Sequence, residues 1–178
     1  PEGREDLVKE FQKKINADLP GRMELELEDF YSSGIFVGKK SQGKKEEVGA
    51  KKKYALLSRS GKIKIRGFEL VRRDWSKVSR NTQRQVLDII LKEGDVAKAA
   101  ALVRVVITDL KEGRIPLEDC VIWTQLRKKT NEYEIVSPEV AAVLNARKQG
   151  LKVAEGSVVG YVVTSQGKTI SEKARVVE

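Results

Sequence analysis

The stretch Lys62-Ile-Lys-Ile-Arg-Gly-Phe-Glu-Leu-Val-Arg-Arg-Asp-Trp75 lies where the residue pattern changes from strand to helix. With Tyr54–Ser58 before it and turn residues at 59–61, the segment Lys62–Val71 predicts the second strand of a β-hairpin. In that strand Ile63 and Ile65 would face one way and the basic residues between them the other. After residue 75 apolar residues recur at helical spacing, so we expect a β-rich part followed by a helical part.

The residues before this hairpin predict one helix and further strands. Apolar residues recur every four positions over 4–17, as in an amphipathic helix. Strict alternation of apolar and acidic residues over Met23–Glu28 predicts a half-buried strand, and Phe30–Val37 predicts another. Gly38–Ala50 combines glycine with serine, lysine and glutamate, so we expect an exposed loop there.

The second part predicts helices over residues 78–94 and 96–111, with Asp95 as a cap between them. The second of these helices would turn Ala97, Ala100, Ala101, Val105 and Leu110 toward a partner element. Ser137 and Pro138 predict the start of a further helix ending at Gly150, and residues 158–163 and 169–177 predict a hairpin. The expected fold class is α+β: an antiparallel sheet with one helix, then a mainly helical part with a small C-terminal β-hairpin.

Composition excludes several kinds of site. The 178 residues contain no His and one Cys, so Ser-His and Cys-His nucleophiles and His-containing zinc sites are excluded. Cys120 cannot form an internal disulfide, which is typical of a reducing compartment. No apolar run approaches the roughly 20 residues that span a bilayer. We therefore expect a cytoplasmic protein without a membrane partner.

The net charge of +9 is concentrated in one segment. Lys39–Arg73 contains thirteen basic residues and three glutamates, a net charge of +10, and the remainder of the chain carries −1. A local field of this kind is typical of a surface that binds phosphates. A solvated lysine-rich loop is the alternative explanation.

Two groups within this segment are candidates for nucleic-acid contact. Lys52 and Tyr54 would share one strand face, where an ammonium and a phenol can reach phosphates or base edges. Gly67 would let a foreign backbone approach its strand, and an arginine–aspartate pair at residues 72–74 would fix the junction while leaving one arginine for phosphate. The alternatives are an exposed lysine run beside a half-buried tyrosine, and a purely structural ion pair beside a core Trp75.

Two further groups are weaker candidates. Glu24, Glu26 and Glu28 would share a strand face and offer the oxygen ligands that Mg²⁺ prefers, although on periodicity alone a solvated strand face is the favoured explanation. Arg127, Lys128 and Lys129 with Tyr133 form a smaller basic and aromatic group in the second part.

Three motifs in a fixed order carry a family resemblance. They are Glu24-Leu-Glu-Leu-Glu-Asp-Phe-Tyr31, Lys51-Lys-Lys-Tyr54 and Arg66-Gly-Phe-Glu-Leu-Val-Arg-Arg-Asp-Trp75. In this order and spacing they closely resemble the archaeal family B DNA polymerases, over nearly the whole chain. The resemblance implies that residues 1–75 are the C-terminal part of a palm domain and residues 76–178 a thumb domain, incomplete at its C-terminus.

The resemblance also implies site residues. Lys52 and Tyr54, with Lys51 and Lys53 beside them, would lie against the minor groove of the primer–template duplex. The strand motif would line the duplex path or lock palm to thumb, through Lys64, Arg66, Gly67, Arg72, Arg73 and Asp74. The thumb would contact the duplex near Arg127, Lys128 and Tyr133. Glu26 and Glu28 would lie at the edge of the Mg²⁺ site of the assembled polymerase.

Other parts of the family pattern do not occur in this sequence. The Tyr-x-Asp-Thr-Asp motif and an upstream aspartate motif supply the family's catalytic carboxylates, so we expect no catalytic residue in these 178 residues. A large partner subunit would carry the exonuclease, the fingers and the catalytic palm, and would hold most of the Mg²⁺ ligands. The stretch between Val37 and Lys51 is longer than the family's usual link, which indicates an insertion.

Two interpretations follow from this resemblance. The chain is expected to be the small subunit of a naturally split replicative DNA polymerase, or a fragment of a single-chain enzyme, with sliding-clamp contacts on a C-terminal tail that it lacks. The alternative is a stand-alone nucleic-acid-binding module without enzymatic activity. The polymerase interpretation predicts an exposed apolar flank on residues 1–37, and the module predicts a finished core.

Overall fold

The computed structural model describes residues 3–39, 48–72, 74–154 and 156–177. Its elements confirm the α+β class. The helices are α1 (Glu5–Asp18), α2 (Lys77–Glu93), α3 (Val96–Lys111), α4 (Leu117–Cys120), α5 (Pro138–Lys148) and α6 (Ile170–Lys173). The strands are β1 (Tyr31–Lys39), β2 (Val48–Ser58), β3 (Ile63–Arg66), β4 (Ile122–Gln125), β5 (Val158–Val163) and β6 (Ala174–Val176), and the 3₁₀ turns are η1 (Glu69–Val71) and η2 (Thr130–Glu132).

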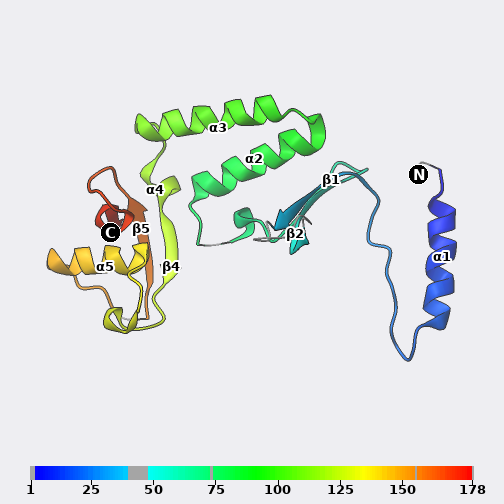
Figure 1. Cartoon of the computed structure of the whole chain (residues 1–178), viewed down its shortest axis with the longest axis horizontal. Coiled ribbons are helices and arrows are strands. Elements are labelled where there is room, and N and C mark those ends of the chain that lie inside the picture. Colours follow the sequence, from blue (N-terminus) through cyan, green and yellow to red (C-terminus); the bar gives the residue numbers. More distant parts are fainter. Residues whose placement is uncertain (1–2, 40–47, 73, 155, 178) are drawn as a thin grey trace.

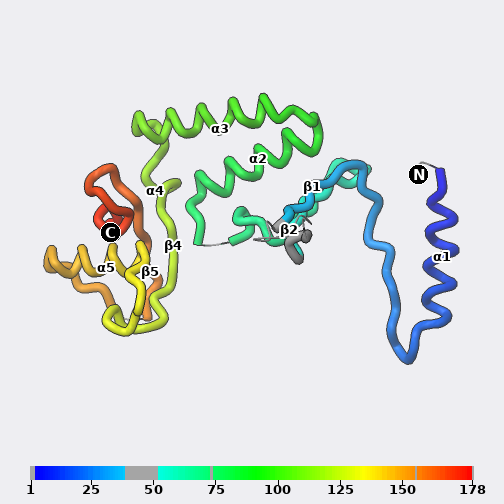
Figure 2. The backbone as a smooth tube through the Cα atoms, viewed as in Figure 1, coloured from blue at the N-terminus to red at the C-terminus, as the bar shows by residue number. Residues whose placement is uncertain are grey.

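The elements follow one another along an elongated molecule. Helix α1 lies at one end, the first sheet and the side-by-side helices α2 and α3 occupy the middle, and α5 lies beside the second sheet at the other end (Figure 1). The backbone trace shows an extended segment joining α1 to β1 (Figure 2). Contacts between α1 and the rest are few: Arg59 Nη1 donates to Glu5 Oε1 at 2.6 Å, and α1 contains no buried residue.

The first sheet has the antiparallel order β1-β2-β3 and encloses a small core. Ala55, Phe68, Leu70, Leu87 and Leu91 are buried there, so η1 and α2 cover one face of the sheet. Ile63 and Ile65 pack against this core, whereas Arg66 is exposed. The predicted division of β3 into an apolar face and a basic face is therefore confirmed.

Two predicted boundaries in this sheet are wrong. The strand predicted over Lys62–Val71 ends at Arg66, because Gly67 has a positive φ of 68° and the chain then forms η1. The loop predicted over Gly38–Ala50 is shorter at both ends, because β1 and β2 continue their pairing to Lys39↔Val48. The rest of that predicted loop and insertion, residues 40–47, lies outside the described residues.

The segment Met23–Glu28 is not a strand, contrary to its alternating pattern. A strand needs a neighbour for its backbone hydrogen bonds, and the described chain offers this segment none. Leu25 bonds instead to α1: its N–H donates to Asn16 Oδ1 at 2.8 Å and its carbonyl accepts from Gln12 Nε2 at 2.6 Å. Side-chain amides of α1 therefore replace part of a sheet ladder.

The predicted helix pair is confirmed in its limits and caps. Helix α2 ends at Gly94 in the left-handed region (φ 69°), and Asp95 accepts the N–H of Lys98 at 2.8 Å as the cap of α3. The predicted contact face of α3 is only partly right: Leu110 lines the α2 side together with Val103 and Val106, but Ala97, Ala101 and Val105 are exposed and the buried residue is Ala99. Apolar residues surround most of this helix, so periodicity does not select one face.

The second sheet has three antiparallel strands in the order β4-β5-β6, not a two-stranded hairpin. Helix α5 contributes the core residues Val140 and Val143, both fully buried. The strand predicted over residues 169–177 is interrupted by α6, because Thr169 caps that helix by accepting the N–H of Glu172 at 3.2 Å. Ser137 precedes α5 as predicted, but its buried hydroxyl has no hydrogen-bond partner among the described residues.

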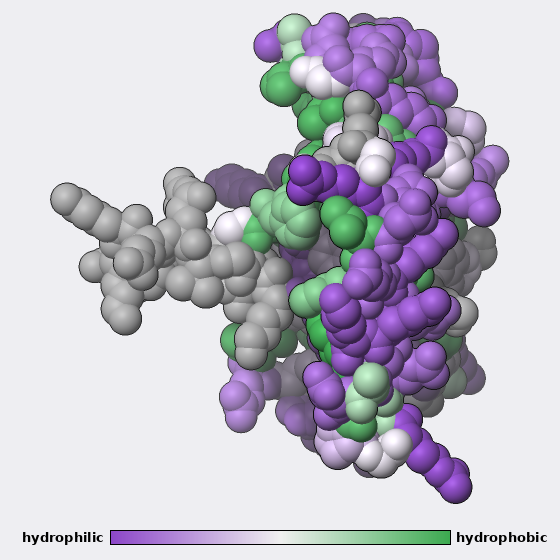
Figure 3. All heavy atoms as spheres, turned by 90° about the vertical axis from the view of Figure 1, so that its right-hand side faces the viewer, coloured by the Kyte–Doolittle hydropathy of each residue, from purple (hydrophilic) through white to green (hydrophobic). Residues whose placement is uncertain are grey.

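Apolar side chains are exposed on the N-terminal segment, as the polymerase interpretation predicts. They include Leu7, Phe11, Met23, Leu25 and Phe36, of which Phe36 is 73% exposed. The face of the molecule at the α1 end shows apolar atoms emerging among charged ones (Figure 3). No helix of the described part is long and apolar enough to cross a membrane.

Candidate nucleic-acid interface

Four of the predicted contact residues line one hollow on the first sheet. Lys52, Tyr54, Arg66 and Gly67 surround a cavity of about 420 Å³. Tyr54 and Arg66 are direct partners in the β2–β3 register, which places them side by side. Lys52 and Arg66 are exposed, and Tyr54 is half-buried with its ring centroid 6.2 Å from that of Phe36. Two cations and a phenol therefore converge on one open surface.

The hollow forms where the backbones of Lys52 and Gly67 come unusually close to each other. Lys52 has a positive φ of 60°, which is uncommon for a residue other than glycine, and it lies where the β1–β2 register shifts. A Cβ on Gly67 would stand 2.1 Å from the Lys52 carbonyl oxygen. The prediction that Gly67 admits a foreign backbone is therefore corrected: the backbone that approaches it belongs to this chain, because β2 bulges at Lys52.

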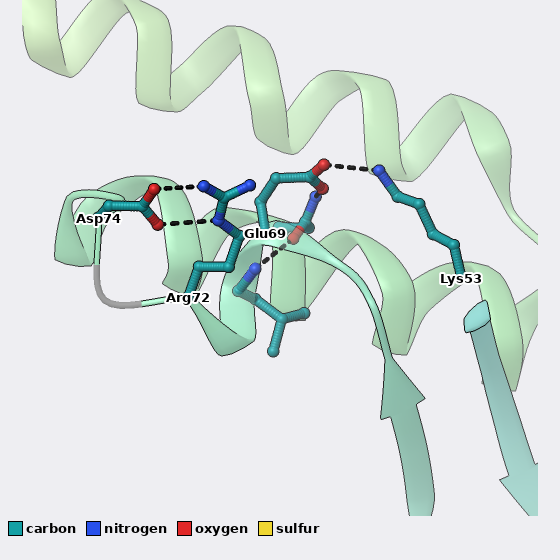
Figure 4. A network of polar contacts seen from close by, with 6 residues as sticks. Lys53, Glu69, Arg72 and Asp74 are labelled. Carbon is teal, nitrogen blue, oxygen red and sulfur yellow. Dashed lines mark hydrogen bonds and ion pairs between the residues drawn. The ribbon is translucent and has the colours of Figure 1, made fainter. Parts of the chain in front are cut away.

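The side chain of Lys53 reaches into a polar network that contains Glu69 (Figure 4). Its ammonium donates to Glu69 Oε1 at 2.5 Å, and Glu69 Oε2 accepts from Gln83 Nε2 at 2.9 Å. Gln83 in turn accepts the N–H of Leu70 at 2.7 Å. The hydrogen bonds from Lys53 and Gln83 lower the pKa of Glu69 to about 2. The network joins β2, η1 and α2, so it links the first sheet to the helix pair.

Other predicted cations are also paired. Lys64 binds Glu28, an interaction that raises the pKa of Lys64. Arg72 binds Asp74 through two hydrogen bonds, with Nε to Oδ1 at 2.8 Å, and this pairing lowers the pKa of Asp74. The predicted arginine–aspartate pair at the junction is therefore present. Arg73 and the side chain of Lys51 lie outside the described residues.

Charge pairing separates the candidates into two classes. In the part of the chain that the structure describes, Lys52 and Arg66 form no ion pair, whereas Lys53, Lys64 and Arg72 each have a carboxylate partner. An unpaired exposed cation can bind a phosphate without first breaking another interaction. Among the candidate cations of the first sheet and its junction, Lys52 and Arg66 are thus the ones available to an anionic ligand.

The second basic group is organised by Tyr133. Its hydroxyl oxygen accepts the backbone N–H of Arg127 at 3.1 Å and that of Lys128 at 3.3 Å. Tyr133 also packs against the core of the second sheet. The tyrosine therefore shapes the turn that presents Arg127 and Lys128, both of which are exposed.

The predicted magnesium-edge residues do not by themselves fit a metal site. Glu28 is engaged by Lys64, and Glu26 is exposed without a neighbouring ligand. Across the described ranges no three acidic or cysteine side chains gather as metal ligands would. Any Mg²⁺ chemistry would therefore need ligands from elsewhere.

Four residues have surroundings that sequence reasoning did not predict. Glu69 and Gln83 hold Lys53, and only the folded chain brings them together over a separation of 14 residues. Trp123 is 53% exposed on β4, and no sequence pattern marked it as a surface residue. Trp75, expected in the core under the structural alternative, is 41% exposed.

Comparison with known proteins identifies the family. A model of the family described as DNA polymerase family B matches residues 2–178. The chain belongs to DNA polymerase family B. The resemblance carried by the three sequence motifs is therefore confirmed.

Relatives within family B come from archaea. The chain is 39% identical over 178 residues to a DNA polymerase of Methanocaldococcus jannaschii, covering 98% of this chain and 10% of that protein. It is 42% identical to a DNA polymerase of Pyrococcus glycovorans, covering 95% of this chain and 20% of that protein. The solved family B DNA polymerase of the hyperthermophilic archaeon Pyrobaculum calidifontis superposes with a TM-score of 0.68 at 29% identity, over 99% of this chain and 21% of that one.

The covered fractions of these relatives show how much of a family B polymerase the 178 residues correspond to. The chain spans about a tenth to a fifth of the length of the family B polymerases that it matches. It therefore corresponds to one portion of a larger polymerase architecture.

Proposed function

We propose that this chain is the duplex-binding portion of a replicative family B DNA polymerase, with residues 1–75 completing the palm and residues 76–178 forming the thumb. The observation that carries the proposal is the hollow where Lys52, Tyr54, Arg66 and Gly67 meet. Its unpaired cations suit phosphates, and its phenol suits the groove-edge acceptors of a duplex. Minor-groove acceptors are similar for every correct base pair, so such a surface can hold product DNA without preferring a sequence.

The remaining polymerase functions would come from a larger region or partner subunit. That region would carry the exonuclease, the fingers and the catalytic carboxylates, and would hold most of the Mg²⁺ ligands for nucleotidyl transfer. The exposed apolar side chains of the N-terminal segment, Leu7, Phe11 and Met23 among them, supply a surface on which it can dock. This same surface favours the polymerase subunit over a stand-alone binding module. Sliding-clamp contacts would belong to segments beyond these residues, and the assembly would act in the cytoplasm.

The proposal predicts DNA binding without synthesis. The purified 178-residue chain should bind primer–template duplexes of unrelated sequence with similar, salt-sensitive affinity, and should extend no primer when given Mg²⁺ and nucleotides. Fluorescence anisotropy measures the first property and a primer-extension gel the second. Primer extension by the chain alone would refute the proposal that the catalytic carboxylates lie in another region or subunit. Failure to bind duplex DNA would refute the proposed duplex-binding function.

Replacing Lys52 by alanine tests the hollow directly. Because Lys52 has no ion pair in the described chain, its loss should weaken duplex binding equally for all sequences. The slope of log affinity against log salt should fall by about one unit. Lys98→Ala is the matched control, since Lys98 is an exposed lysine on α3 whose ammonium lies 2.7 Å from Glu93. If the salt slope of Lys52→Ala is unchanged, Lys52 does not contact the duplex and is a solvated surface lysine.

A further inference from the structure

Trp123 lies flat on the second sheet with one ring face open. A Cβ on Gly160, its register partner on β5, would stand 2.9 Å from the Trp123 Cη2 and Cζ3 atoms. Only a glycine at this position lets the indole lie so close to the strand. The ring is therefore held by the backbone beneath it, yet the side chain is 53% exposed.

Trp123 also lines an open cavity between the second sheet and the junction before α2. This cavity of about 630 Å³ is walled by Trp123 and Thr124 of β4, by Arg127 just after that strand, and by Arg72 and Asp74 from the junction before α2. Its volume falls within the range of roughly 300–1,000 Å³ typical of small-ligand pockets. Residues more than fifty positions apart in sequence thus form one site.

The charges around this cavity favour an anionic ligand. Arg72 is neutralised by its two hydrogen bonds with Asp74. Arg127 forms no ion pair with any described carboxylate, and the Tyr133 hydroxyl fixes its backbone at 3.1 Å. The described residues that line the cavity therefore carry a net charge of +1, located on Arg127, and they include the exposed aromatic ring of Trp123.

We propose that this cavity holds a single unpaired nucleotide of a DNA strand, with its base stacked on Trp123 and its phosphate bound by Arg127. An aromatic face next to a cation is the combination that binds unpaired nucleotides, because each base offers a π-face and each phosphate a charge. Inside a duplex both faces of a base are covered by neighbouring pairs, so internal paired bases cannot use the indole in this way. The inference rests on the proposed duplex-binding function and adds a site for a strand that leaves the duplex.

Tryptophan fluorescence tests this site. The chain contains two tryptophans, so Trp75→Phe leaves Trp123 as the only indole reporter. In this background we expect saturable quenching by duplexes that carry an unpaired nucleotide, and none by a blunt duplex of the same sequence. A template overhang and a mismatched primer end are compared as separate substrates, and the one that quenches identifies the strand.

Affinity measurements with variants complete the test. Trp123→Ala should weaken binding of the overhang duplex by roughly five- to a hundredfold and leave blunt-duplex affinity unchanged, whereas Trp123→Phe should retain most of the affinity. Thermal unfolding and blunt-duplex binding report whether each variant is folded. Absence of quenching, or equal weakening of blunt and overhang binding, would overturn the inference. Because blunt-duplex binding is measured independently, its presence keeps the proposed function intact when the Trp123 site fails.

Discussion

Gly67→Ala is expected to lower the free energy of unfolding by about 3–4 kcal/mol and to abolish tight duplex binding. Two effects add. The residue has a φ of 68°, where a side chain costs about 1 kcal/mol or more, and its Cβ would meet the Lys52 carbonyl oxygen at 2.1 Å. That oxygen is backbone, so relief of the clash requires β2 and the turn after β3 to separate. Separation would disperse Lys52, Tyr54 and Arg66.

Gly61→Ala is a matched control for the backbone effect. Gly61 has a φ of 84° in the β2–β3 turn, and a Cβ there would meet no atom within 4 Å. Its replacement should therefore cost only about 1 kcal/mol and leave duplex affinity intact. Urea denaturation followed by circular dichroism gives both stabilities, and anisotropy gives both affinities. Equal losses for the two variants would mean that the close approach of Lys52 and Gly67 contributes nothing beyond φ strain.

The same contrast explains which features could be predicted from sequence. The β2–β3 turn, the Gly94 end of α2 and the Asp95 cap depend on residues within a few positions of each other, so local patterns identify them. The approach of Gly67 to Lys52 depends on a bulge in a neighbouring strand, which no local pattern encodes. Sequence therefore identified Gly67 as a close-approach position but assigned the wrong backbone.

The strand prediction for Met23–Glu28 was wrong for a related reason. Alternation states which side chains would share a face, but a strand exists only where another backbone supplies hydrogen bonds. In the described chain, α1 side chains occupy the Leu25 backbone groups instead. Under the proposed function, a palm strand outside these residues is the natural pairing partner for this segment.

The ion-pair partners seen in the structure change the interpretation of the positive charge over Lys39–Arg73. Glu69 binds Lys53, and three carboxylates from outside the segment bind further cations: Glu5 binds Arg59, Glu28 binds Lys64 and Asp74 binds Arg72. Part of the basic segment thus serves to join elements, whereas Lys52 and Arg66, among the described residues, have no ion-pair partner and can bind a polyanion. A count of charges could not separate these roles, because ion pairing is set by the fold.

Glu69→Gln is expected to destabilise the chain at neutral pH by on the order of 2–3 kcal/mol and to remove part of its sensitivity to acid. Glu69 is three-quarters buried, and its pKa is lowered from 4.5 to about 2 by Lys53 and Gln83. Since the folded-state pKa lies below the unfolded value, this stabilisation is complete above the unfolded pKa and is lost as the pH falls toward about 2. In the variant, Lys53 would keep its partial burial without a counter-charge.

Urea denaturation at a series of pH values measures this effect. The stability of the unmodified chain should fall between about pH 5 and pH 2, and the curve of Glu69→Gln should be flatter and converge with it at the acid end. Glu26→Gln, which removes an exposed carboxylate with no partner among the described residues, should follow the unmodified curve. Parallel curves for Glu69→Gln and the unmodified chain would show that the Lys53–Glu69 pair does not stabilise the fold. Because this pair joins β2 to η1 and, through Gln83, to α2, convergence at low pH would also identify the link between the first sheet and the helix pair as an acid-sensitive one.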